Sequence, residues 1–284
     1  MICRGGFRTN KYVHLPLIKM GIIMEDWVNN LNKWFNFYCD SFKELTGEQQ
    51  RNFDIKRDHS FRVADFSVQL AAKLEFSFEE QKLAYFIGLF HDIGRFNQLV
   101  EFNTFDDLKS VDHAEYSVKV LKDEGVLAKF EIENEDLIFT SIENHNKLKL
   151  PEKLSDKELK FARLIRDADK IDILKVLTEY YSTRNVNANH TLTWDLPKGS
   201  SVSKAVSKEV LDGKLVSKKN VVSEIDVKIM QMSWVYDLNY RSSFEHLLKK
   251  RFLETVYNTL PKNDLVIEIY RKVKVYSENI IYNS

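Results

Sequence analysis

The stretch LAYFIGLFHDIGRF, residues 83–96, combines an apolar helical pattern with a polar His-Asp pair. Its large apolar residues recur at the steps of three and four that place side chains on one face of an α-helix: Leu83, Phe86, Ile87 and Phe90. His91 and Asp92 follow directly, and Gly94 offers a point where the helix ends or bends. A histidine and a carboxylate at the end of an apolar helix predict a polar site inside a helical protein.

Helical periodicity continues on both sides of this stretch, so the sequence predicts an all-α protein. Ser77 is a predicted N-cap for the helix that runs to His91 and Asp92. The other expected helices cover residues 24–42, 55–74, 112–123, 134–146, 156–179, 202–211, 221–238 and 244–260. Residues 97–111 and 182–201 lack periodicity and predict loops, and the last dozen residues are compatible with a helix or a strand.

This pattern divides the chain into three predicted parts. Residues 1–23 are expected to be a leader, either disordered or translated from upstream of a natural start at Met24. Residues 24–180 form the predicted helical core, and residues 181–284 a C-terminal helical extension packed on that core. The aromatic residues of the extension are expected in its core, with a dimer interface as the alternative.

The composition excludes several classes of protein. The chain has 284 residues, 44% of them hydrophobic, which is enough for a substantial core. Lys+Arg and Asp+Glu balance at 42 each, so there is no basic field for wrapping long nucleic acid. Two cysteines without a CxxC motif predict reduced thiols in a cytoplasmic protein. The sequence contains no run of about 18 apolar residues, so it predicts no membrane span.

Four further residues of metal-ligand type share the context of the His-Asp pair, because each lies in or beside a predicted amphipathic helix: His59, His113, His145 and Asp169. A carboxylate on an inner helix face costs several kcal/mol unless it is paired or binds a metal. One such residue is easily a paired core group, but five helices that each aim one inward predict a metal cluster. The remaining histidines, His14, His190 and His246, lack this context, and we expect them to be ordinary.

With these residues in their order, the sequence resembles the HD-domain phosphohydrolase superfamily. The signature of that family is a His, a His-Asp doublet and a distant Asp on a helical scaffold. The resemblance extends through TFDDLKSVDHAEYS (104–117), IENHNK (142–147) and RLIRDADKIDIL (163–174). It covers residues 24–180, and implies that they form a catalytic HD-type helical bundle, followed by a mostly helical C-terminal lobe. The GYP motif of the cyclic-di-GMP phosphodiesterase branch is absent.

The resemblance also implies how the ligands are shared between two divalent ions. His59, His91, Asp92 and Asp169 would hold the first ion. Asp92 would bridge to a second ion that His113 and His145 complete. Imidazole and carboxylate ligands suit Mn, Fe, Co, Ni, Zn or Mg. Two ions about 3.5–4 Å apart clamp a phosphoryl group and lower the pKa of a bridging water, so no Ser or Cys nucleophile is needed.

Positive side chains near the ligands are expected to bind the phosphate oxygens. Arg95 is the first candidate and Lys170, next to Asp169, is the second; Arg62 and Lys147 are weaker candidates. The loop that carries Phe102, Thr104 and Phe105 is expected to cover the site or to stack on a base, with ordinary packing as the alternative.

The leading functional hypothesis is therefore metal-dependent hydrolysis of a phosphoester in a nucleotide or a related small phosphorylated metabolite. A diiron oxygenase of the HD type would keep the ligands and change the chemistry. A non-catalytic module that binds a nucleotide or a partner would keep only the fold. The chain is also compatible with a homo-oligomer.

Overall fold

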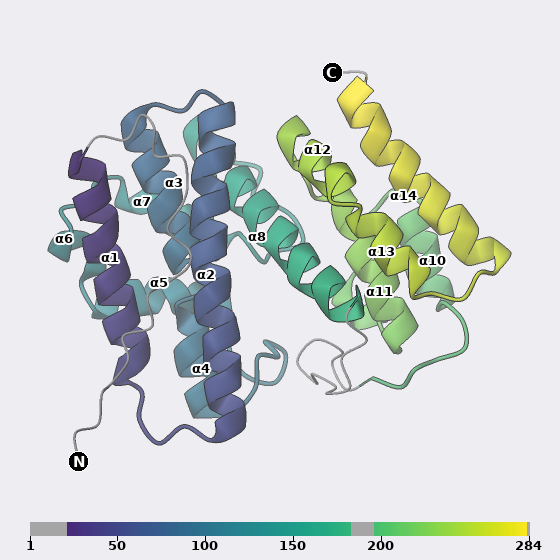
Figure 1. Cartoon of the computed structure of the whole chain (residues 1–284), viewed down its shortest axis with the longest axis horizontal. Helices are drawn as coiled ribbons and strands as arrows, with labels where there is room; N and C mark the ends of the chain where they lie inside the picture. Colours follow the sequence, from purple (N-terminus) through teal and green to yellow (C-terminus); the bar gives the residue numbers. More distant parts are fainter. Residues whose placement is uncertain (1–21, 183–195, 283–284) are drawn as a thin grey trace, which may run out of the picture. The chain divides into compact units, whose positions relative to one another are not determined.

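The computed structural model describes residues 22–182 and 196–282, and these contain helices and no strand (Figure 1). The chain divides into two compact units, residues 1–41 and 42–284. The first unit contains α1 (Ile22–Ser41), in which the rings of Trp34 and Tyr38 stack. The prediction of an all-α protein is confirmed. Residues 1–21 of the predicted leader lie outside the described residues.

Two capped helices begin the second unit, α2 (Gly47–Lys73) and α3 (Phe78–Phe90). Thr46 and Gln49 form a capping box at the start of α2, and the predicted cap Ser77 forms another with Glu80 at the start of α3. In each box a hydroxyl and a carboxamide or carboxylate accept hydrogen bonds from backbone N–H groups that the helix leaves unpaired. The helix starts are thus encoded locally.

The two helices approach most closely at Gly88 of α3. A β-carbon added there would lie 2.7 Å from Ala64 Cα and 2.9 Å from Ser67 Oγ, both on α2. These distances are shorter than any normal carbon contact, so only glycine lets the backbones come so near. This approach brings the end of α3 beside the middle of α2.

Five helices continue the chain: α4 (Gly94–Phe102), α5 (His113–Asp123), α6 (Val126–Lys129), α7 (Glu135–Glu143) and α8 (Asp156–Ser182). The loop predicted for residues 97–111 is wrong in its first part, because residues 97–102 belong to α4. The helix predicted for residues 134–146 ends at Glu143, which leaves His145 in the following loop. Gly94 begins a helix after a short turn, and does not end one.

Residues 196–282 contain a second group of helices: α10 (Lys204–Leu211), α11 (Glu224–Ser233), α12 (Arg241–Lys249), α13 (Phe252–Asn258) and α14 (Asp264–Tyr282). Two short 3-10 helices, η1 (Lys218–Asn220) and η2 (Trp234–Tyr236), lie among them. The single helix predicted for residues 244–260 is wrong, because the chain breaks at Arg251, which has a φ of 57°. The last dozen residues, for which the sequence allowed a helix or a strand, belong to the helix α14 as far as Tyr282. Residues 183–195 of the predicted loop 182–201 lie outside the described part.

A continuous apolar cluster runs through this second group and includes Ile171 and Leu174 of α8. Phe244 and Phe252 are buried in the same cluster, which favours the core role for these aromatic residues. α8 therefore packs against both groups of helices. None of the described helices has the length and apolar character that crossing a membrane requires.

We predict that Gly88→Ala lowers the free energy of unfolding by about 1–3 kcal/mol, because the new methyl group overpacks the contact between α2 and α3. Gly47→Ala is the matched control, since its β-carbon would meet nothing closer than 3.8 Å. Urea denaturation measures both. Equal stability of the two variants would show that the helices separate without cost.

Candidate metal centre

The six predicted ligands come from five different segments of the second unit. His59 lies on α2 and Asp169 on α8, while His91 and Asp92 lie in the turn that joins α3 to α4. His113 is the first residue of α5, and His145 lies in the loop after α7. Each of the six residues, backbone and side chain together, is at most 9% exposed. The structure therefore gathers them in the interior.

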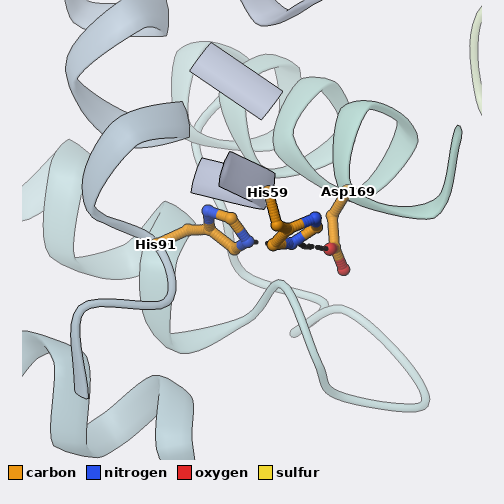
Figure 2. Close-up of side chains that lie close together, drawn as sticks. All are labelled: His59, His91 and Asp169. Atoms are coloured by element: carbon orange, nitrogen blue, oxygen red, sulfur yellow. Dashed lines mark ion pairs between the residues drawn. The ribbon is translucent and has the colours of Figure 1, made fainter. Parts of the chain in front are cut away.

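A first group of side-chain atoms meets where α2, α8 and the end of α3 converge (Figure 2). His59 Nε2 lies 3.1 Å from Asp169 Oδ1, and His91 Nε2 lies 3.6 Å from the same oxygen. Asp92 Oδ2 is 3.7 Å from both imidazole nitrogens. These four residues offer two imidazoles and two carboxylates at one point.

A second group meets at the other oxygen of Asp92. Asp92 Oδ1 lies 3.4 Å from His113 Nε2 and 3.7 Å from His145 Nε2. The two imidazole nitrogens are themselves 3.1 Å apart. Asp92 thus presents one oxygen to each group, which is the geometry that a bridging carboxylate needs.

The Nδ1 atom of each histidine contacts an acceptor. Asp172 Oδ2 lies 2.7 Å from His59 Nδ1, and Asp107 Oδ2 lies 2.6 Å from His113 Nδ1. His91 and His145 place Nδ1 at 2.8 and 2.7 Å from the carbonyl oxygens of Gly88 and Ile142. Because carboxylates and carbonyls only accept, the proton of each neutral imidazole lies on Nδ1, and Nε2 keeps its lone pair. Metal-binding histidines are held in the same way.

These lone pairs face one another without a donor between them. His113 Nε2 and His145 Nε2 are two acceptors in hydrogen-bond contact, which is repulsive unless a proton or a cation lies between them. Within the described part of the chain, His59 Nε2, His91 Nε2 and Asp92 Oδ1 are buried and make no hydrogen bond. Unpaired buried groups are costly, so this donor set fits divalent ions.

The pKa values of these groups reflect the same arrangement. Burial, reinforced by the charge of Arg95, lowers the pKa of His113 to about 3. Burial also lowers the pKa of His91, against the opposing effect of Asp92. At His59 burial and the charge of Lys56 act in the same direction, but the hydrogen bonds to Asp169 and Asp172 outweigh them and raise its pKa. Although burial alone would raise them, the pKa values of Asp92 and Asp169 are held well below the usual range, by Lys56 and His91 for Asp92 and by His59 and His91 for Asp169. Ionised carboxylates and neutral imidazoles are the forms that bind metals.

Two cations lie beside Asp92. Lys56, which the sequence did not single out, places Nζ 2.6 Å from Asp92 Oδ2. Arg95 places Nε 3.6 Å from Asp92 Oδ1, while its Nη1 donates to Phe105 O, Gln98 and Asp107. The ring of Phe105 lies between 5 and 6 Å from both cationic groups. Arg95 therefore lies at the site, where its contacts also hold the loop of Phe105.

The other predicted cations have carboxylate partners of their own. Lys170 places Nζ 2.5 Å from Asp237 Oδ2, and Lys147 pairs with Asp112 and Glu115. Arg62 donates two hydrogen bonds to Asp172, the carboxylate that orients His59. These contacts favour supporting roles for the three residues, so a phosphate-binding role for them stays an untested prediction.

The sequence did not indicate Lys56, Asp107 or Asp172 as members of the site. Lys56 precedes His59 by three residues and Asp172 follows Asp169 by three, so helical spacing places each on the same helix face as its ligand. That spacing was the available signal. No spacing in the sequence indicated Asp107, because its contact with His113 depends on the path of the loop. Asp112 caps α5 and pairs with Lys147, so its oxygens serve structure.

Gly94 allows α4 to cross α5 beside the cluster. A β-carbon at Gly94 would lie 2.5 Å from Ser117 N and 3.0 Å from His113 O. The Gly94 N–H donates to Ser117 Oγ at 3.0 Å. This close crossing is what carries His113 up to Asp92.

The fold and this cluster define a helical protein with a buried histidine and aspartate centre of the type that binds metals. Residues 57–174 match the family model of the HD domain, and they contain all six clustered residues. Over these residues the chain carries an HD domain, the domain that characterises the superfamily of HD-domain metal-dependent phosphohydrolases. No curated protein and no solved structure matches the chain.

We predict that Asp172→Asn weakens Mn²⁺ binding by about 10- to 100-fold, which is the usual effect of removing a carboxylate that orients a metal-binding histidine. Isothermal titration of the ion-free protein measures the affinity. Asp123→Asn, a surface change on α5, is the control and should bind as the wild type does. An unchanged affinity in Asp172→Asn would mean that His59 is not a ligand.

Proposed function

We propose that this protein hydrolyses a phosphoester of a nucleotide or a related small phosphorylated metabolite, with two divalent ions and with water as the attacking group. The observation that carries the proposal is the convergence of four imidazole lone pairs on the two oxygens of Asp92 and on Asp169. The HD-domain match supports hydrolase chemistry in general, because most members of that family are metal-dependent phosphohydrolases.

In this proposal His59, His91, Asp92 and Asp169 hold the first ion, and His113, His145 and Asp92 hold the second. Bound divalent ions supply a lowered pKa for a ligated water and positive charge beside the phosphoryl oxygens. The four Nδ1 contacts keep the imidazoles in the tautomer and orientation that this task needs.

The chain itself supplies the groups that would bind and orient the substrate. Lys56 and Arg95 lie on either side of Asp92, so their charges are placed to bind the nonbridging oxygens of a phosphate group. The Phe105 ring, which lies against both cations, would pack on the organic part of the substrate. The Asp169 side chain is 13% exposed, against 4% for His113 and 2% for His145, so the first group of ligands is the more open to solvent.

We predict that the metal-loaded protein hydrolyses members of a broad panel of nucleotides and phosphoesters, and that His91→Ala and Asp92→Ala abolish this activity. Phosphate release in the presence of Mn²⁺ or Fe²⁺ is the measurement. His246→Gln is the matched control, because His246 lies outside the cluster, against Phe66 and Phe252. An inert protein with two bound ions would refute the proposal, and oxygen consumption by the ferrous protein would favour an oxygenase.

We predict that Lys56→Met raises KM about tenfold or more, since a hydrogen bond to a charged group contributes about 1.5–3 kcal/mol. Lys56→Arg should retain much of the binding, because a guanidinium also binds phosphate oxygens. Steady-state kinetics and inhibition by inorganic phosphate report the change. If Lys56→Met kept the wild-type KM and phosphate inhibition, the ammonium group would serve only to neutralise Asp92.

A further inference from the structure

Arg166 is a cation of α8 with almost no access to water. It is 1% exposed and is among the largest fully buried side chains of the described chain. Its Nη1 donates to the carbonyl oxygens of Asn144 and Lys147, at 2.7 and 2.6 Å, and lies 3.4 Å from the carbonyl oxygen of His145. One guanidinium thus holds the loop on both sides of His145.

The other end of this guanidinium contacts the C-terminal helices. Arg166 Nη2 donates to Asp237 Oδ1 at 2.6 Å, and Asp237 Oδ2 lies 2.5 Å from Lys170 Nζ. Asp237 follows η2 and lies outside the residues that match the HD domain. The carboxylate of Asp237 is the acidic partner of Arg166 in these contacts. A positive charge that is buried so deeply needs such a partner.

The planar guanidinium links the position of Asp237 to the position of the loop around His145. Because its donors form a rigid fork, the bond to Asp237 fixes the direction in which Nη1 points. That direction fixes the two carbonyl oxygens that flank His145. The His145 ring is held locally by Ile142 O, so the path of the loop then decides where its Nε2 lies relative to His113 and Asp92.

We infer that Asp237 is a positioning residue for the second metal: through Arg166 it sets the place of His145, and the C-terminal helices thereby control the occupancy of that ion. The inference rests on the two-ion site proposed above. It assigns a role to a part of the chain that lies beyond the HD domain. The first ion depends on it less, because its ligands come from α2, from the turn after α3 and from α8, and not from the loop of His145.

A neighbouring contact allows the positioning role of Asp237 to be tested apart from the attachment of residues 237–240 to α8. Asp167, next to Arg166, accepts hydrogen bonds from the backbone N–H groups of Asn239 and Tyr240 and from Asn239 Nδ2. These hydrogen bonds attach residues 239–240 to α8, and none of them involves the loop of His145. Asn239 Nδ2 also donates to the backbone carbonyl of Asp237, at 2.7 Å. Asn239→Ala therefore weakens the attachment of this segment, but keeps the Asp237 carboxylate that accepts from Arg166.

The test compares Asp237→Ala with Asn239→Ala and the wild type in two measurements. Titration with Mn²⁺ gives the number and affinity of bound ions, and hydrogen exchange of the ion-free protein reports the amides around residue 145. We expect Asp237→Ala to weaken the second ion by about 10- to 100-fold, as losses of outer contacts usually do. We also expect faster exchange at residues 144–148 and an unchanged first ion. Asn239→Ala should resemble the wild type in both.

Wild-type ion binding and exchange in Asp237→Ala would overturn the inference, as would equal losses in both variants. If Asp237→Ala does not fold, Asp237→Asn replaces it, because the amide keeps one acceptor oxygen, and a smaller shift in the same direction is expected. A wild type that binds fewer than two ions would refute the proposed two-ion site. Hydrogen exchange would then still decide whether Asp237 holds the loop.

Discussion

The mutual repulsion of unpaired acceptors is the constraint on which the centre depends. Four imidazoles turn their Nε2 lone pairs toward each other and toward two ionised carboxylates, in a region with little access to water. Burial strengthens electrostatic interactions, so this arrangement is costly unless positive charge enters it. Lys56 supplies part of that charge through Asp92. A protein that needed only stability would have no reason to hold His113 Nε2 and His145 Nε2 3.1 Å apart.

The surrounding structure keeps this costly arrangement from relaxing. Carbonyl oxygens and carboxylates fix all four Nδ1 atoms, and each orienting carboxylate has a partner of its own, such as Arg62 for Asp172 and Arg95 for Asp107. Gly88 and Gly94 permit helix crossings too close for any β-carbon, and these crossings bring His91 near His59 and His113 near Asp92. Rigid secondary structure and such supporting contacts are what a precise binding site requires.

The sequence by itself determined the helical class and the types of residue at the site. Periodic apolar residues and local caps such as Ser77 act over a few positions, so they can be seen without a structure. It also indicated which six residues to consider, because an imidazole or a carboxylate on an inner helix face is costly unless it is paired or binds an ion. Their roles as ligands remain proposals that metal binding must test. Where local signals were weak, at residues 97–102 and at Arg251, the sequence prediction failed.

Only the tertiary structure decided which atoms meet and which charges support them. Lys56 joined the site, while the ammonium of Lys170 paired with Asp237, a residue 67 positions along the chain whose proximity no local pattern encodes. Asp107 reached His113 because of the path of a loop, and Arg166 reached the carbonyl oxygens around His145 because α8 packs against α7, which that loop follows. Periodicity reports which face of a helix is buried. The partner on the opposite side of the contact is set by how whole helices cross.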